Sequence, residues 1–315
     1  MQRYLVGRLL ALIPVLLGIL VVVFLLIRLI PGDAVQLFLG TQVEMTPEQM
    51  AELRRFFGVD KPLWAQFVDY LSRVLRGDFG VSLRTSRPVL PDILQRLPLS
   101  FQLATLALVV AVALAVPLGI ASAVTRNSAL DLAVRVGGLL GLSMPNFWLG
   151  AMLILLFSRY LHVSLGQYTP ITVNPVATLQ SLYLPALALG AAIAAILMRY
   201  VRSSLLEVLG QDYVRTARGK GLREQVVLLH HALPNALIPV ITVAGFQMGY
   251  LLGGTVVIEG IFALPGMGRL VLQAIFQRDY PVVQGVVLVI AFLFVLTNLV
   301  VDLLYAWIDP RIRYQ

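Results

Sequence analysis

Long apolar runs dominate this chain, and charged residues gather in the segments between them. About 20 consecutive apolar residues are enough for a helix to cross the hydrocarbon core of a bilayer. Five charge-free runs, and a first run that carries only Arg28, approach or exceed that length. We therefore predict six transmembrane helices, over Leu9 to Ile30, Leu97 to Thr125, Val136 to Ser158, Leu182 to Met198, Leu237 to Ile258 and Pro281 to Val301.

None of these six helices is lost to the polar or helix-breaking residues within it. Arg28 lies near the outer end of the first run, where its side chain can reach the membrane interface. Pro14, Pro117 and Pro145 are tolerated where neighbouring helices satisfy the carbonyls that they free. The basic start Met1–Arg8 is also typical of a signal peptide, but the apolar run is too long and lacks a small-residue cleavage site. We expect this segment to remain attached as the first transmembrane helix.

The connection from Gly32 to Arg96 contains helix signals of its own. Thr46 followed by Gln49 is typical of a capping box, and Gly58 is a stop signal further on. A second amphipathic stretch before Gly77 places its apolar side chains on one face: Trp64, Phe67, Val68, Leu71 and Leu75. We expect a small helical subdomain outside the membrane, which either caps the first two transmembrane helices or contacts an extracytoplasmic partner.

A polar, basic segment from Leu205 to Pro239 interrupts the apolar pattern. Leucines and a valine alternate with charges up to Leu209, and the pattern resumes after Gly219 and Gly221. Glycine allows the positive φ of a sharp reversal, so the sequence predicts a helix, a turn and a second helix. Pro234 and Pro239 are expected to limit the second helix before the fifth transmembrane helix begins.

The distribution of charge between the runs predicts the orientation of the chain. Arg3 and Arg8 precede the first run, and the fourth-to-fifth connection carries six basic against three acidic residues. The connections on the other side are more balanced, with eight charges of each sign in the first of them. Because basic loops stay in the cytoplasm, we expect both termini and the Leu205 to Pro239 segment to be cytoplasmic.

Composition supports a membrane protein and excludes several kinds of chemistry. Of the 315 residues, 59% are hydrophobic and only 13% are charged. The net charge of +8 follows the positive-inside bias, so we expect no nucleic-acid partner. The absence of cysteine excludes disulfides and thiolate metal sites. No phosphate-binding loop is present, because Gly219-Lys220-Gly221 lacks the first glycine and the terminal hydroxyl of that motif.

Isolated polar residues give little support to a catalytic or metal site. His230 and His231 point about 100° apart around a helix, so they cannot easily bind one metal ion. Asn298 and Asp302 lie one helical turn apart near the end of the last run, and fit an interfacial pair. Ser203 has no plausible base nearby. We therefore expect no catalytic residue and no metal in this chain.

The polar segment resembles the EAA motif of ABC importer permeases. Arg215-Thr-Ala, then Gly221, His231 and Leu233-Pro234, match its spacing. Arg215, Thr216 and His231 differ from the general motif, and Tyr213-Val-Arg-Thr-Ala-Arg-Gly-Lys-Gly-Leu222 is similar to the version in dipeptide and oligopeptide permeases. Segments elsewhere resemble the B-type subunit of that family: Arg28 to Asp33, Gly77 to Ser82, Ser143 to Gly150, Glu259 to Gly268 and Arg278 to Gly285.

The resemblance covers nearly the whole chain and implies its fold and domains. It implies an all-α polytopic membrane protein with six transmembrane helices, in the type I ABC importer permease fold. Residues 1–31 then form the first transmembrane helix and 32–96 the extracytoplasmic helical subdomain. The five-helix core spans 97–306, with the cytosolic coupling loop at 205–239, and 307–315 form a cytosolic tail.

The resemblance also implies partners and site residues. A homologous second permease (giving a heterodimer), two ATP-binding subunits, an extracytoplasmic substrate-binding protein and membrane lipid are the expected partners. ATP and Mg belong to the ATPase subunits, and this chain holds no cofactor. The expected ATPase-coupling residues are Asp212, Tyr213, Arg215, Thr216, Ala217, Arg218, Gly219, Lys220, Gly221, Leu222, Leu233 and Pro234. An outer gate or receptor contact is expected at Glu259, Phe262, Pro265, Gly266 and Gly268.

Several functions stay open at this stage. The leading one is the permease subunit of an ATP-driven peptide importer in a bacterial or archaeal inner membrane. Similar subunits serve nickel chelates, glutathione and oligosaccharides, so the sequence does not name the cargo. A secondary transporter is the second class, although inverted repeats and paired ionisable groups at mid-membrane are absent from the sequence. A membrane enzyme is the third class, and it lacks clustered catalytic groups.

Overall fold

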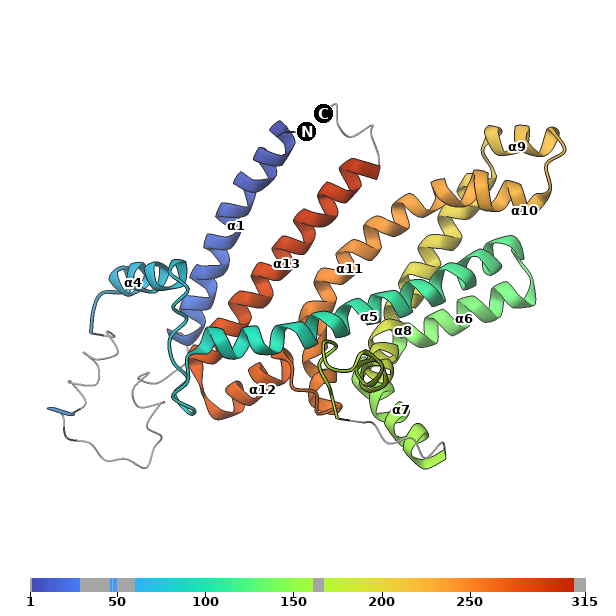
Figure 1. Ribbon diagram of the computed structural model, residues 1–315. Helices are drawn as coiled ribbons and strands as arrows, with labels where there is room; N and C mark the ends of the chain where they lie inside the picture. The colour runs from blue at the N-terminus through green and yellow to red at the C-terminus, as the bar shows by residue number, and fades with distance from the viewer. Residues whose placement is uncertain (1, 29–45, 47, 50–59, 161–166, 309–315) are drawn as a thin grey trace. The chain divides into compact units, whose positions relative to one another are not determined.

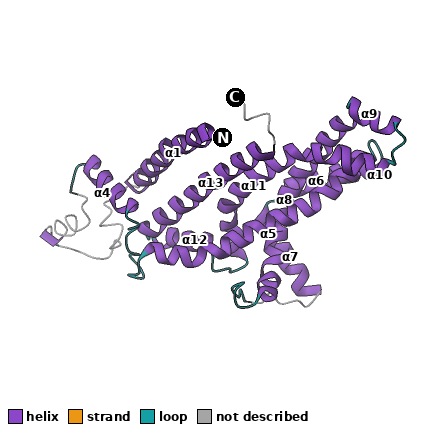
Figure 2. Ribbon diagram, turned by 45° about the horizontal axis from the view of Figure 1, so that its top comes forward, coloured by secondary structure: helices purple, strands orange, loops and turns teal. Residues whose placement is uncertain are grey.

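The computed structural model describes residues 2–28, 46, 48–49, 60–160 and 167–308. Every regular element within these ranges is a helix, and the only strand-like pairing among them is an isolated bridge between Val81 and Pro88. Figure 2 shows this helical architecture. The prediction of an all-α membrane protein is confirmed.

Four helical stretches in the described residues are long and apolar enough to span a membrane. They are Val89–Val124 (α5), Pro175–Leu209 (α8), Glu224–Ile261 and residues 280–303 of α13, which runs from Tyr280 to Ile308. Ala129–Ser143 (α6) and Asn146–Tyr160 (α7) make a fifth only if the bent pair counts as one span. Gln2–Arg28 (α1) contains a shorter apolar stretch at Leu10–Leu25.

The expected third transmembrane helix, Val136 to Ser158, is not one helix. α6 ends at Ser143, α7 begins at Asn146, and the two are bent by 103°. Met144 has the extended ψ of 125° that a residue before proline prefers, so Pro145 breaks the helix. The prediction that Pro145 is tolerated inside a continuous helix is wrong.

The first compact unit comprises Met1–Pro98 and Pro265–Val295. In this unit Leu63–Leu75 (α4) packs on α1, with the Phe24 and Phe67 rings 5.2 Å apart. Arg28 donates two hydrogen bonds to Gln66 on α4, at 3.0 and 2.8 Å. Burial raises the pKa of Tyr70, on the same helix, to about 12. The amphipathic helix expected before Gly77 is therefore present, and it is fixed to α1.

Two segments from opposite ends of the chain meet in the first unit. The Ser82 hydroxyl and the backbone N–H of Leu83 donate hydrogen bonds to the buried Asp279 carboxylate. Arg84 donates to the carbonyl of Gln277, the last residue of Met267–Gln277 (α12). Two segments resemble the family separately in the sequence, Gly77 to Ser82 and Arg278 to Gly285. Hydrogen bonds join these two segments in the folded chain.

The expected capping box is confirmed. The Thr46 N–H donates to Gln49 Oε1 at 3.1 Å, and the Gln49 N–H donates to Thr46 Oγ1 at 3.4 Å. The rest of the helix expected after it, including its stop at Gly58, lies outside the described residues.

The second compact unit comprises Leu99–Leu264 and Leu296–Gln315, and α8 is its central helix. In the apolar window of α8, 72% of the residues are buried, against 22% in the window of the Glu224–Ile261 helix. Small residues let the backbones approach closely, as expected between membrane helices. A Cβ on Gly190 of α8 would lie 2.7 Å from the Ala107 carbonyl of α5. A Cβ on Gly245 would meet Val301 of α13 at 2.5 Å.

Candidate functional site

The polar segment between α8 and the next long helix folds as a short helix against a longer one. Asp212–Gly219 (α9) follows α8, a turn at Lys220–Arg223 reverses the chain, and Glu224–Val226 (α10) begins the return. In Figure 1, α9 and α10 lie where the ends of α8 and Leu233–Ile261 (α11) meet. The predicted helix, turn and helix are confirmed.

Three kinds of contact fix α9 to its neighbours. Val214 and Ala217 are buried together with Val227. Arg218 forms a two-point pair with Glu224, with nitrogen-to-oxygen distances of 2.6 and 3.1 Å. This hydrogen-bonded pair raises the pKa of the Arg218 guanidinium above its ordinary value, so the charge is permanent. These contacts hold the short helix against the longer one.

A third contact joins α9 to the beginning of α11. The Asn235 side-chain amide donates a hydrogen bond to the Tyr213 hydroxyl at 3.0 Å. The base of the segment is also packed, because Leu205, Ala232 and Ala236 form a buried cluster with Ala123 of α5. The segment is thus connected to three membrane helices of its unit.

The return helix does not end at the prolines. Val227–Ala232 (η1) is a π-helical turn, and it joins α10 to α11 in one helix from Glu224 to Ile261. Pro234 lies in the first turn of α11, and Pro239 lies inside it. The prediction that these prolines limit the helix is wrong. Pro234 removes a regular helical hydrogen bond, and the wide π turn just before it accommodates this loss.

The structure sorts the expected coupling residues into two groups. Ala217 lies on the buried face of α9, and Leu233 is half-buried. The others are exposed: Asp212, Tyr213, Arg215, Thr216, Arg218, Gly219, Lys220, Gly221, Leu222 and Pro234. Ala217 therefore permits the close packing of α9 on its own chain.

Gly221 makes the turn possible through its backbone conformation. Its φ is +76°, and an added Cβ would meet no atom within 4 Å. A side chain would fit in the space, but an L-residue is strained at this φ. The expected positive φ at this glycine is confirmed, whereas Gly219 is part of α9 and has no positive φ.

The residues expected to form an outer gate also differ in exposure. Glu259 is fully buried and accepts a hydrogen bond from the Ser100 hydroxyl at 2.6 Å. Phe262 is half-buried and lies beside Gly150, where a Cβ would come within 3.0 Å of the ring. Gly266 and Gly268 are buried, and Pro265 is exposed. Pro265 is therefore accessible for direct contact with a partner, whereas the Glu259 carboxylate is not.

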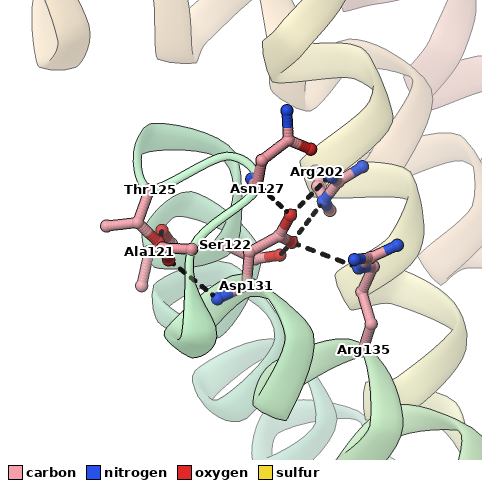
Figure 3. A network of polar contacts seen from close by, with 8 residues as sticks. Ala121, Ser122, Thr125, Asn127, Asp131, Arg135 and Arg202 are labelled. Atoms are coloured by element: carbon pink, nitrogen blue, oxygen red, sulfur yellow. Dashed lines mark hydrogen bonds and ion pairs between the residues drawn. The ribbon is translucent and has the colours of Figure 1, made fainter.

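Sequence reasoning missed a buried acidic centre at the start of α6. Asp131 has no exposed surface and forms a two-point pair with Arg202 of α8, at 2.8 and 2.9 Å. It also accepts hydrogen bonds from the Ser122 hydroxyl and the Asn127 N–H, and pairs with Arg135 at 3.5 Å. Figure 3 shows these donors around one carboxylate. A lone acid among arginines, just after the N-cap Ser128, was the available signal.

The described residues contain no group of three or more His, Asp or Glu side chains that could hold a metal ion. Among them His230 is exposed and His231 is half-buried, side by side in the π turn.

Comparison with known proteins identifies the class. Residues 115–314 match the family of binding-protein-dependent transport system inner membrane components, and residues 1–104 match the N-terminal domain of such components. The chain belongs to this family. It is an inner-membrane, multi-pass permease component of an ABC transporter and is not itself catalytic. Membership also implies permease, ATPase and binding-protein partners.

Individual relatives cover the whole chain. The glutathione transport system permease protein GsiC of Pectobacterium atrosepticum is 44% identical over 318 residues, with 100% of both chains covered. The dipeptide transport system permease protein DppB is 42% identical in Alkalihalophilus pseudofirmus and 39% identical in Escherichia coli K12, again with 100% of both chains covered.

A solved structure supports the fold. The methionine ABC transporter MetNI, in inward-facing conformations, matches with a TM-score of 0.56 and 18% identity, over 69% of this chain and 96% of that chain. At this identity the likeness shows the fold alone, which is that of an ABC importer permease.

Proposed function

We propose that this chain is the permease subunit of an ATP-driven importer of small peptides, and that its 205–239 segment couples it to a cytosolic ATPase. The observation that carries the coupling role is the exposed α9 unit, which packs on the helix that follows it. It is fixed to the following helix by the Val214–Val227 contact and the Arg218–Glu224 pair. A displacement of α9 therefore moves α8 and α11 with it, as rigid-body transmission requires.

The exposed chemistry of α9 fits a protein partner. Arg215 is paired only at 3.3 Å with Asp212, and the side chains of these two residues are 72% and 96% exposed. Lys220 and Tyr213 are exposed beside them. Permanent cations next to an exposed aromatic ring are suited to an acidic groove on another subunit.

Charge reversal tests this coupling role. We expect the double variant Arg215→Glu, Lys220→Glu to reach the membrane in normal amounts but to lose co-purification with the ATPase subunits. Both positions are exposed, and neither supports a buried contact. Arg126→Glu is the matched control, because Arg126 is an exposed arginine in the α5–α6 connection, for which we propose the same side of the membrane. Full ATPase association in the double variant would count against coupling.

The proposed cargo is a di- or oligopeptide, with glutathione as the second candidate. Relatives named for dipeptide transport and for glutathione transport are similarly identical to this chain, at 39–42% and 43–44%. Both cargoes are small molecules with amide bonds, free carboxylates and an amine. Uptake of a labelled dipeptide and of labelled glutathione, measured in the same vesicles with the cognate binding protein and ATP, separates the two.

The proposed assembly and topology complete this function. The chain pairs with a homologous permease in a heterodimer, with two ATPases and one extracytoplasmic binding protein. Six transmembrane helices place both termini in the cytoplasm, and the α4 region lies outside. Pro265 and Phe262 are proposed at an outer gate or receptor contact.

A further inference from the structure

A basic cavity lies between α6 and α8. Its volume is about 520 Å³. Two of its lining residues come from α6 and four from α8: Arg135, Leu139, Arg199, Tyr200, Arg202 and Ser203. Three arginines thus line a space large enough for a polar headgroup.

The acidic groups nearby do not neutralise these three arginines. Arg202 is held by the buried Asp131 through two hydrogen bonds, and Arg135 reaches the same carboxylate at 3.5 Å. Figure 3 shows both arginines directed to this single acid. Arg199 has no hydrogen bond or ion pair with any residue that the structure describes. Three cations and one anion leave a net charge of about +2 at the cavity.

The sequence on both sides of the cavity is that expected at a membrane interface. Arg135 directly precedes the charge-free run Val136 to Ser158, and Arg199 directly follows the charge-free run Leu182 to Met198. Both arginines therefore stand where apolar sequence meets polar sequence. Tyr200 in the cavity wall is 42% exposed, as is common for interfacial aromatic residues.

The surface beside the cavity is apolar. Leu132 and Leu139 of α6 are 55% and 57% exposed and lie on the same side of the helix as Arg135. Such a surface on a membrane helix is suited to acyl chains. A soluble anion would use the arginines and leave these leucines without a partner, whereas a phospholipid uses both.

We propose that this cavity binds the phosphate headgroup of an anionic membrane phospholipid, with its acyl chains along the exposed face of α6. Basic pockets between transmembrane helices on the cytoplasmic side are recognised sites for such headgroups. Arginine is well suited, since its planar guanidinium binds phosphate at two points. The proposal needs only the membrane location of the chain and does not depend on the coupling role or the cargo.

Native mass spectrometry of the full-length chain tests the proposal. The detergent-purified protein is mixed with phosphatidylglycerol or with phosphatidylcholine of the same acyl composition. We expect the wild type to retain one phosphatidylglycerol preferentially. Arg199→Gln should weaken its retention about fivefold, and Arg135→Gln with Arg199→Gln about 25-fold, from the usual contribution of one arginine near a membrane surface.

Matched variants separate this site from general attraction to charge. Arg199→Lys keeps the charge and should retain most of the binding. Arg126→Gln removes an exposed arginine outside the cavity and should bind as the wild type does. Arg199 has no partner among the described residues, so its replacement leaves the Asp131 network intact.

Three results would overturn the assignment. Equal retention of the two lipids by the wild type, or unchanged retention by Arg199→Gln, excludes an anionic-lipid site here. Displacement of phosphatidylglycerol by millimolar inorganic phosphate would instead assign the cavity to soluble anions. None of these results bears on ATPase association, so failure of this proposal is distinguishable from failure of the proposed function.

Discussion

Asp131 has no exposed surface, so its charge depends entirely on the groups that donate to it. Removing one member of a buried pair costs about 3–5 kcal/mol, because the remaining charge is left without compensation. Exposed pairs contribute less than about 1 kcal/mol. Arg202 and Arg135 therefore make unequal contributions, since Arg202 donates two hydrogen bonds and Arg135 is 49% exposed at 3.5 Å.

The two arginines can be compared directly. Arg202→Gln should lower the free energy of unfolding by about 3–5 kcal/mol. Arg135→Gln should lower it by less than about 1 kcal/mol. Thermal unfolding in detergent, followed by tryptophan fluorescence, measures both variants against the wild type. Equal shifts in melting temperature would show that the Arg202–Asp131 pair is no stronger than an exposed one.

Gly221 and Gly219 form a second matched pair of residues. Neither glycine would meet an atom within 4 Å on gaining a Cβ, but only Gly221 has a positive φ. Gly221→Ala should cost about 1 kcal/mol of local stability through backbone strain. Gly219→Ala should stabilise α9 by up to about 1 kcal/mol through helix propensity.

Hydrogen exchange of the amides between residues 212 and 226 distinguishes the two alanine variants. We expect exchange about fivefold faster in Gly221→Ala and unchanged or slower in Gly219→Ala, since a change of about 1 kcal/mol corresponds to about fivefold in an opening equilibrium. Equal rates in both would contradict the role of φ.

At the scale of elements, the π turn Val227–Ala232 joins the coupling segment to α11. A π turn behaves as one extra residue in an α-helix, and the helices on either side keep their orientation. Deleting the exposed Leu229 should therefore convert the turn to α-helix and preserve the buried contacts around Val214 and Ala236.

A deletion elsewhere in the helix serves as the control. Removing Tyr250, which is 64% exposed within regular α11, rotates one end by about 100° and takes Gly245 away from Val301. We expect the Leu229 deletion to purify as a monodisperse protein by size-exclusion chromatography and the Tyr250 deletion to aggregate. Aggregation of both would mean that the π turn is required for the fold.

Local patterns made several elements predictable from sequence. Thr46 and Gln49 indicated a capping box, Gly221 indicated a turn, and the apolar period before Gly77 indicated α4. Each signal acts within a few residues. The predictions for Pro145 and Pro234 were wrong, because the effect of a proline depends on the conformation of the backbone around it.

The polar centres were not predictable, because their partners are distant in sequence. Ser82 and Asp279 are separated by 197 positions, and Asp131 and Arg202 by 71. Nothing in the pattern near Asp131 says which arginine will pair with it. The motifs around Ser82 and Asp279 resembled a family separately, and only the folded chain shows that they bind each other.

At the scale of the whole molecule, the number of membrane crossings depends on the bent pair α6 and α7. A broken span carries the chain across the membrane, whereas a re-entrant pair returns it to the same side. Because α5 alone separates Arg76 from Arg126, we expect these two residues on opposite sides of the membrane in either case. Lys220 lies on the side of Arg126 only if α6 and α7 cross together, because α8 then brings the chain back.

Labelling of single introduced cysteines reports the side of the membrane on which each residue lies, because the chain has no cysteine of its own. We expect Arg76→Cys to react with a membrane-impermeant maleimide on intact spheroplasts, and Arg126→Cys and Lys220→Cys to react only after permeabilisation. All three positions are exposed, so access depends on the membrane and not on burial. Labelling of Arg76→Cys together with Lys220→Cys in intact spheroplasts would place the proposed coupling segment outside the cell, away from any ATPase.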